Sequence, residues 1–183
     1  MAEIGHNRGP SMEPGLAWRS HCWKAAREAL LPTLPIEVVR LRVKRAQDLG
    51  LDYKTYASVR AATGHDLVAF LFSSNALRLV KGRKEIGPQE TAKLLAMDCA
   101  RIGLATAPLR AQAMAQNTAL DAAHPAPFAL ASFPQTRALI REALGKTPSD
   151  RVLLVGDLPL EREWCAAGRL AGYLPAERFF ARA

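Results

Sequence analysis

Two short, continuous apolar blocks constrain the fold more than any other feature of this sequence. Residues 67–72 (LVAFLF) and 151–157 (RVLLVGD) are bounded by turn residues, and helix-length segments lie between them. Strands that are apolar at nearly every position are typical of a parallel sheet buried on both faces. We therefore expect an α/β fold, in which a small, mostly parallel three-layer sheet domain follows an N-terminal helical segment.

The rest of the chain alternates between helical periodicity and short apolar runs. Residues 108–127 are rich in Ala and Pro without a clear period, so we expect a long connection or a loose helix there. The predicted organisation is a flexible tail (1–15), a helical segment (16–64) and an α/β Rossmann-like domain (65–183). The predicted helices are 16–31, 35–49, 53–62, 88–100, 134–144 and 159–171, and the predicted strands are 67–72, 102–107, 128–133 and 151–157.

Composition narrows the class of protein. With 183 residues, 49% of them hydrophobic, the chain suffices for one domain with a proper core. No apolar stretch approaches the length of a membrane span and the first residues do not resemble a signal peptide, so we expect a cytoplasmic protein without a membrane partner. The net charge of +8 favours polyanionic partners such as nucleic acid or acidic proteins.

Cysteine and histidine spacing predicts neither disulfides nor a metal site. Cys22, Cys99 and Cys165 are far apart in the sequence and we interpret them as small core residues. The four histidines form no pair at the spacing of metal ligands. Because no glycine-rich phosphate loop is present either, we expect no metal and no cofactor.

Residues 43–64 (VKRAQDLGLDYKTYASVRAATG) form a unit of two predicted helices around Gly50. Ala46 permits close approach of the helices, Gly50 permits the tight turn, and Tyr56 and Val59 face inward. The unit resembles the helix-turn-helix of bacterial DNA-binding proteins. The alternative is a structural helical hairpin packed beside the sheet. The resemblance implies a nucleic-acid interface in which Lys54, Thr55 and Ser58 face the major groove and Arg42 and Arg45 reach phosphates.

Polar residues follow the predicted strands where a parallel sheet binds its ligands, at the carboxyl ends. The candidate ligand-binding residues are Ser73, Ser74, Asn75, Ser132, Lys146 and Asp157. The alternative is that the serines, Asn75 and Asp157 only cap helices. A serine nucleophile at Ser73 needs a base, and only His65 and His124 are at hand, without the glycine elbow that exposes such a serine.

The order of the segments AFLFSSNAL, LASF, GKTPSD and LLVGDLPLEREWCAAGRLAG resembles the haloacid dehalogenase-like superfamily over residues 67–172. In that family an Asp after the first strand attacks phosphorus, a second Asp acts as acid and base, and Mg²⁺ joins the first Asp to a later acidic residue. This chain has Ser73 and Asn75 at the first two positions and Asp157 at the last. The resemblance thus implies a cleft without catalytic residues, since Ser73 cannot form an aspartyl-phosphate and Asn75 cannot shuttle a proton.

We therefore expect a non-catalytic binding or regulatory protein with nucleic acid as its partner. A divergent phosphate-ester hydrolase or phosphate-ligand-binding protein is the first alternative. The second is an accessory subunit of a larger complex, with a protein as the partner. The C-terminal segment has two possible uses. Its aromatic residues Tyr173, Phe179 and Phe180 either pack on the sheet or, in an accessory subunit, dock on the partner.

Overall fold

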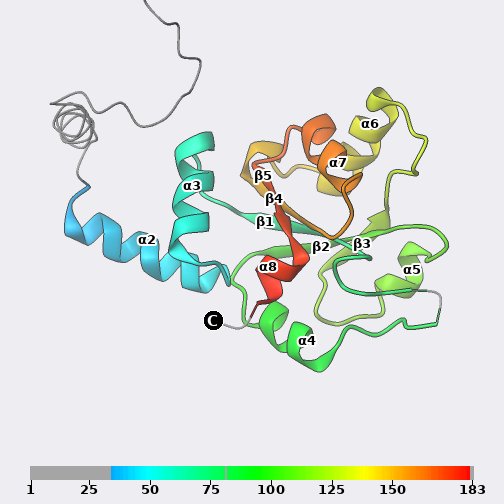
Figure 1. Cartoon of the computed structure of the whole chain (residues 1–183), viewed down its shortest axis with the longest axis horizontal. Coiled ribbons are helices and arrows are strands. Elements are labelled where there is room, and N and C mark those ends of the chain that lie inside the picture. Colours follow the sequence, from blue (N-terminus) through cyan, green and yellow to red (C-terminus); the bar gives the residue numbers. More distant parts are fainter. Residues whose placement is uncertain (1–33, 81, 182–183) are drawn as a thin grey trace, which may run out of the picture. The chain divides into compact units, whose positions relative to one another are not determined.

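A computed structural model describes residues 34–80 and 82–181 of the chain. Its centre is a five-stranded, entirely parallel sheet in the order β3-β2-β1-β4-β5 (Figure 1). The predicted α/β class with a parallel sheet is therefore confirmed. The strands are β1 (Ala69–Ser73), β2 (Ala100–Ala105), β3 (Ala122–Pro125), β4 (Val152–Gly156) and β5 (Gly172–Pro175).

Helices connect the parallel strands, because consecutive parallel strands need a crossover that returns the chain to the same edge. Within the described residues the helices are α2 (Ile36–Asp48), α3 (Tyr53–Thr63), α4 (Pro88–Leu95), α5 (Ala111–Met114), α6 (Phe133–Leu144), α7 (Glu161–Gly168) and α8 (Ala176–Phe180), with a 3₁₀ turn, η1 (Ser149–Arg151).

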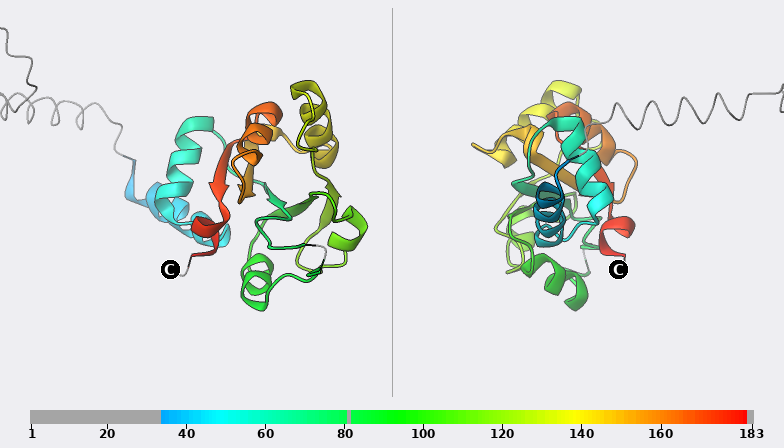
Figure 2. Two further views of the ribbon diagram at one scale, coloured as in Figure 1. Left: turned by 45° about the vertical axis from the view of Figure 1, so that its right-hand side comes forward. Right: turned by 90° about the vertical axis from the view of Figure 1, so that its left-hand side faces the viewer.

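Two hydrophobic clusters lie on opposite faces of the sheet. Alternate residues of β1 enter each of them, with Phe70 and Phe72 on one face and Ala69 and Leu71 on the other. The first cluster also contains buried residues of α2, α3, α4, α5 and α8. The second is closed by α6 and α7, which lie side by side in Figures 1 and 2 and contribute Ile140 and Trp164. The domain therefore has three layers.

The C-terminal aromatic residues pack on the sheet. Phe179 is 2% exposed, and its ring centroid lies 5.8 Å from that of Phe70 and 5.5 Å from that of Phe72. Phe180 meets Phe179 edge-on at 4.8 Å. Of the two uses expected for this segment, packing is the one that the structure shows for Phe179.

The helical hairpin is built as its turn residues predict. Gly50 adopts a φ of +66°, a left-handed conformation that favours glycine, and Asp52 caps α3 by accepting a hydrogen bond from the Thr55 backbone N–H at 2.9 Å. Leu49 and Tyr56 are buried in the same cluster as Phe70. The hairpin is thus part of the sheet's own core.

A polar network joins this hairpin to the start of β1. Asp66 accepts hydrogen bonds from Tyr56 Oη at 2.8 Å and from Arg45 Nε at 3.0 Å. Arg45 also donates to the Leu67 carbonyl at 3.1 Å and to the Asp98 carbonyl at 3.2 Å. One guanidinium therefore holds α2, the start of β1 and the turn before β2 together.

Three predicted elements differ from the structure. Residues 128–133 are not a strand: the Ala131 N–H bonds to the Phe128 carbonyl in a turn, and Phe133 already begins α6. The edge strands are β3 and β5, and neither was predicted. The sequence of β3, AAHP, has no β-branched or aromatic residue to signal a strand. The helix predicted over 88–100 ends at Leu95, because Ala100 pairs with Ala69 in the sheet. The predicted loose connection therefore contains α5 and β3.

Several expectations concern residues outside the described ranges. They are the tail over 1–15, the helix over 16–31, and the roles of Cys22, His6 and His21.

The Asp66 network predicts how stability depends on pH. Burial alone raises the pKa of Asp66, but the hydrogen bonds from Tyr56 and Arg45 outweigh it and hold the pKa below its ordinary value. Asp66 therefore contributes stability that is complete above its unfolded pKa of about 3.9 and is lost as pH falls through the lower folded value. We expect Asp66→Asn to be less stable than wild type at pH 7 and the gap to narrow below about pH 4, measured by urea unfolding at each pH.

Asp98→Asn is the matched control, because the Asp98 carboxylate is 85% exposed and approaches Arg45 only to 3.4 Å. A gap that is the same at pH 7 and pH 3, or a control that behaves like Asp66→Asn, would contradict this account.

Candidate functional site

The carboxyl edge of the sheet gathers polar side chains from β1, β2 and the β4–α7 connection. Asn75 follows β1, Thr106 follows β2 and Asp157 follows β4. Because the strands are parallel and adjacent in the order β2-β1-β4, these positions meet at one edge. This is where the sequence predicts the ligand site.

Ser73 and Ser74 are completely buried and engaged internally. Ser73 Oγ accepts a hydrogen bond from the Ala76 backbone N–H at 3.0 Å, which forms the turn after β1. Ser74 Oγ accepts from the Thr106 backbone N–H at 3.0 Å and also bonds to the Thr106 hydroxyl. Both hydroxyls thus stabilise the ends of strands and are closed to a ligand.

Neither candidate base is placed to activate Ser73. His65 precedes β1, so it lies at the opposite end of that strand, where its Nε2 is 3.5 Å from the Asp150 carboxylate. His124 is on β3, and β2 separates that strand from β1. A serine nucleophile with a histidine base is therefore absent from this edge of the described structure.

A buried carboxyl group, Glu161, links Asn75 to the loop after β4. Glu161 is 1% exposed, and its Oε1 accepts a hydrogen bond from Asn75 Nδ2 at 2.9 Å. Its Oε2 accepts from the backbone N–H groups of Asp157 at 2.6 Å and Leu158 at 3.1 Å. Three N–H donors offset the cost of burying this group.

Sequence reasoning missed Thr106 and Glu161. Thr106 ends the second apolar run, so its position at the sheet edge was readable from the strand pattern. Glu161 lies four residues after Asp157, where one helical turn brings a side chain back to the loop that precedes it. Both are central to the edge because they engage Ser74 and Asn75.

A small cavity of about 50 Å³ lies beside this network. It is lined by Asn75, Ala76, Arg78, Glu90, Asp157, Ala176, Glu177 and Phe180. Small-molecule sites usually enclose about 300–1,000 Å³, so this cavity is too small to enclose a whole phosphate ester. Among the described residues no group of three His, Cys, Asp or Glu side chains is arranged to hold a metal ion.

Two predicted ligand residues lie apart from this edge network. Ser132 is exposed and forms a capping box with Gln135 at the start of α6, as the capping alternative expected. Lys146 follows α6 and precedes β4, so the topology places it at the amino edge of the sheet, opposite Asn75. The prediction that Lys146 lies near the cleft is therefore wrong. Lys146 and Asp157 are close in sequence, but the whole of β4 lies between them and places them at opposite edges of the sheet.

The predicted nucleic-acid residues divide into two groups. Arg45 is engaged with Asp66 and two carbonyl groups, and Thr55 is buried, where its hydroxyl donates to Asp52 and accepts from Arg178 Nη2 at 2.8 Å. Lys54 and Ser58 are exposed, and Arg42 is half-buried. The hairpin therefore presents part of the predicted interface to solvent.

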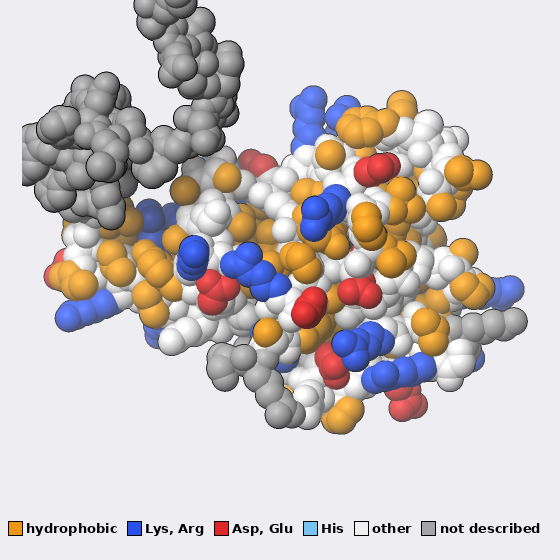
Figure 3. Space-filling view, in the orientation of Figure 1, with side chains coloured by type: hydrophobic (Ala, Val, Ile, Leu, Met, Phe, Trp, Pro, Cys, Tyr) orange, Lys and Arg blue, Asp and Glu red, His pale blue; other side chains and the backbone are white. Residues whose placement is uncertain are grey.

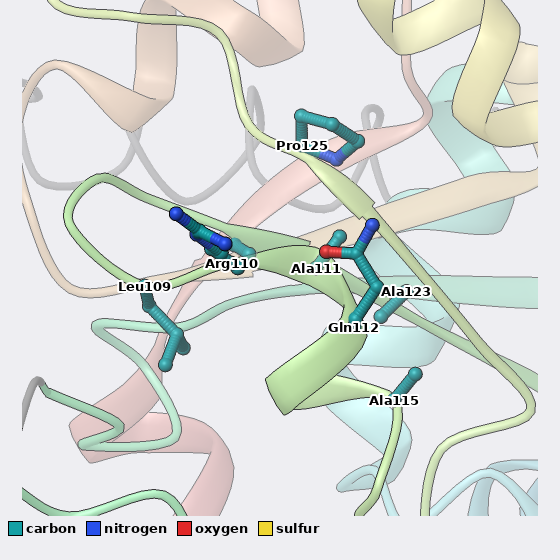
Figure 4. Close-up of a pocket in the computed structure, with 8 residues that line it drawn as sticks. Leu109, Arg110, Ala111, Gln112, Ala115, Ala123 and Pro125 are labelled. Carbon is teal, nitrogen blue, oxygen red and sulfur yellow. The ribbon is translucent and has the colours of Figure 1, made fainter.

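A pocket of about 510 Å³ lies between α5 and the ends of β2 and β3 (Figure 4). Its wall is mostly small and apolar, with several alanines, Leu109 and Pro125. Arg110 and Gln112 supply its polar side chains. The pocket thus has one guanidinium and one amide but no side chain able to act as base or nucleophile.

The described cysteines are not poised for chemistry. Burial raises the pKa of the Cys99 thiol to about 12, and it also raises the pKa of Cys165. The thiolate is the reactive form, so neither residue is a nucleophile near neutral pH. No helix in the described ranges is long and apolar enough to cross a membrane.

Replacing Glu161 by Ala should open the carboxyl edge. The change leaves two backbone N–H groups and the Asn75 amide without their acceptor, and each such loss costs about 1–3 kcal/mol when water cannot replace it. Asp157 and Leu158 are exposed, so water replaces part of what their N–H groups lose and the total stays below the sum of three full losses. We expect the free energy of unfolding to fall by about 2–4 kcal/mol in urea titrations. Glu163→Ala, an exposed position on the same helix, should change it by less than about 0.5 kcal/mol. Equal effects of the two variants would show that the edge does not depend on Glu161.

Comparison of the chain with models of protein families, with curated proteins and with solved structures finds no match in any of the three. The two resemblances stated from the sequence therefore remain proposals.

Proposed function

We propose that this chain is a non-catalytic binding protein whose partner is nucleic acid. The observation that carries the proposal is that basic side chains are exposed on both helices of the α2–α3 hairpin, and Figure 3 shows Lys and Arg side chains over the region of α2. Arg40, Lys44 and Lys54 are exposed, and within the described residues none of them has an acidic partner within ion-pair distance. Uncompensated cations at a surface attract phosphates, because each contact releases condensed counterions.

The geometry favours contact with the nucleic-acid backbone. Thr55, in the middle of the predicted recognition surface, is buried beneath Arg178. In the first two turns of α3 the exposed residues are Lys54 and Ser58, which lie one helical turn apart. Such a surface can bind phosphates but has few groups to read base edges, so binding should depend little on sequence.

The non-catalytic part of the proposal rests on the carboxyl edge. The polar groups there are already hydrogen-bonded within the protein. Ser73 bonds to the Ala76 N–H, Ser74 to Thr106 and Asn75 to Glu161. A nucleophile must be presented to its substrate, and these hydroxyls are completely buried.

Two alternatives retain some support. A phosphate-ligand-binding protein resembling the haloacid dehalogenase-like superfamily is favoured by the meeting of Asn75, Thr106 and Asp157 at the edge of β2-β1-β4. An accessory subunit is favoured by exposed apolar side chains around the start of α6, where Leu130 is 90% exposed and Phe128 and Phe133 are both 54% exposed.

Fluorescence anisotropy on labelled duplex DNA and single-stranded RNA, from about 50 to 200 mM salt, tests the proposal. We expect affinity to fall steeply with salt and to vary little between unrelated sequences. Lys54→Glu should weaken binding and reduce the salt slope by about one, whereas Lys84→Glu, an equal charge reversal on an exposed loop, should leave the slope unchanged. Absence of binding at 50 mM salt, or equal effects of the two variants, would refute the proposed interface.

A hydrolysis assay separates the proposal from its enzymatic alternative. We expect no Mg²⁺-dependent release of p-nitrophenol from p-nitrophenyl phosphate above the rate of buffer. Turnover that disappears in Asp157→Asn would instead establish the divergent hydrolase.

A further inference from the structure

A basic pocket lies between α6, α7 and η1, on the face of the sheet opposite the hairpin. Its volume is about 240 Å³, and it is lined by Arg137, Arg141, Ser149, Gly168 and Arg169. Figures 1 and 2 show α6 and α7 side by side above this part of the sheet. Three arginines thus line one cavity that has no acidic side chain in its lining.

Capping of helix ends does not account for all three arginines. At the end of α7, the carbonyls of Cys165 and Ala166 accept the backbone N–H groups of Leu170 and Arg169, and the Ala167 carbonyl accepts Arg137 Nε at 3.0 Å. At the end of α6, the Arg141 carbonyl accepts the Gly145 N–H. Most of the carbonyls at both helix ends therefore have donors already, and none of these donors belongs to the side chain of Arg141 or Arg169.

Arg137 is fixed in position and still has N–H groups that can donate hydrogen bonds to a ligand. Its Nε is fixed on the Ala167 carbonyl and its guanidinium lies 5.5 Å from the centroid of the Phe133 ring. Among the described residues its two terminal nitrogens have no hydrogen-bond partner. A guanidinium that is braced in this way loses little entropy when it binds an anion.

Arg169 stands where a helix ordinarily ends in glycine. Its φ is +54°, in the left-handed region that costs a residue with a Cβ more than glycine. Arg141 and Arg169 are exposed, and within the described residues neither has an acidic partner. Like charges around one cavity repel each other, and a bound anion would offset this repulsion.

We propose that this pocket binds a phosphate group, as free phosphate compounds or phosphate esters carry it. Guanidinium groups match phosphate oxygens with paired hydrogen bonds, and the Ser149 hydroxyl adds a further donor. The cavity is smaller than the usual site for a whole small molecule, so it holds the phosphate part and leaves the remainder outside. The site is separate from the hairpin surface of the proposed function and does not rest on it.

Titration calorimetry with inorganic pyrophosphate, at constant ionic strength, tests the pocket. We expect saturable one-site binding to wild type. The double variant Arg141→Gln/Arg169→Gln should weaken it at least tenfold, while Arg110→Gln/Lys84→Gln, which removes two charges elsewhere, should stay within twofold of wild type. No saturable heat with wild type, or equal losses in both variants, would overturn the proposal.

Two further measurements sharpen the test. Arg141→Lys/Arg169→Lys keeps the charge but removes the paired geometry, so an affinity between wild type and the glutamine variant is expected and an affinity equal to wild type would overturn the guanidinium assignment. A titration with adenosine diphosphate distinguishes free phosphate compounds from phosphate esters as ligands. An affinity equal to that of pyrophosphate indicates recognition of phosphate alone, and tighter binding indicates a nucleotide. Lys54→Glu should keep pyrophosphate binding intact, so failure here is distinguishable from failure of the nucleic-acid interface.

Discussion

Burial of β1 on both faces is the constraint on which the rest of the structure depends. Every residue of this strand is buried, with Phe70 and Phe72 in one cluster and Ala69 and Leu71 in the other. Helices must therefore cover both faces, and strands must pair with both edges of β1. The same burial extends to Ser73 and Ser74, whose hydroxyls must find partners within the protein because water cannot reach them.

That requirement shapes what the carboxyl edge can do. Ser74 bonds with Thr106, and Asn75 bonds with Glu161, so the groups that follow β1 are committed to neighbouring strands and loops. The polar residues at this edge therefore support the sheet. Binding is then expected at surfaces where charge is left uncompensated, such as the hairpin around Lys54 and the pocket around Arg137.

The candidate site could be predicted only in part. That Ser73 and Asn75 would meet Asp157 at one edge followed from strand-end positions, since parallel strands bring their carboxyl ends together. A capping role for Ser73 was one of the two uses expected, and Ser73 Oγ does accept the Ala76 N–H in its own turn. The complete burial of Ser73 could not be predicted, because burial depends on how loops fold over the strand end. Lys146 was misplaced because its distance along the chain from Asp157 gave no information about which edge of the sheet it occupies.

The sequence by itself determined the α/β class, the central strands and the hairpin, because these depend on local periodicity, apolar runs and the residues Gly50 and Asp52. Only the tertiary structure decided the edge strand β3, the closure of the carboxyl edge by Glu161 and the convergence of Arg137, Arg141 and Arg169. The physical reason is that a short strand such as AAHP is stabilised by its partner strand. In the same way, a buried carboxylate or a cluster of arginines is formed by residues that are distant in sequence. Neither leaves a periodic signal in the chain.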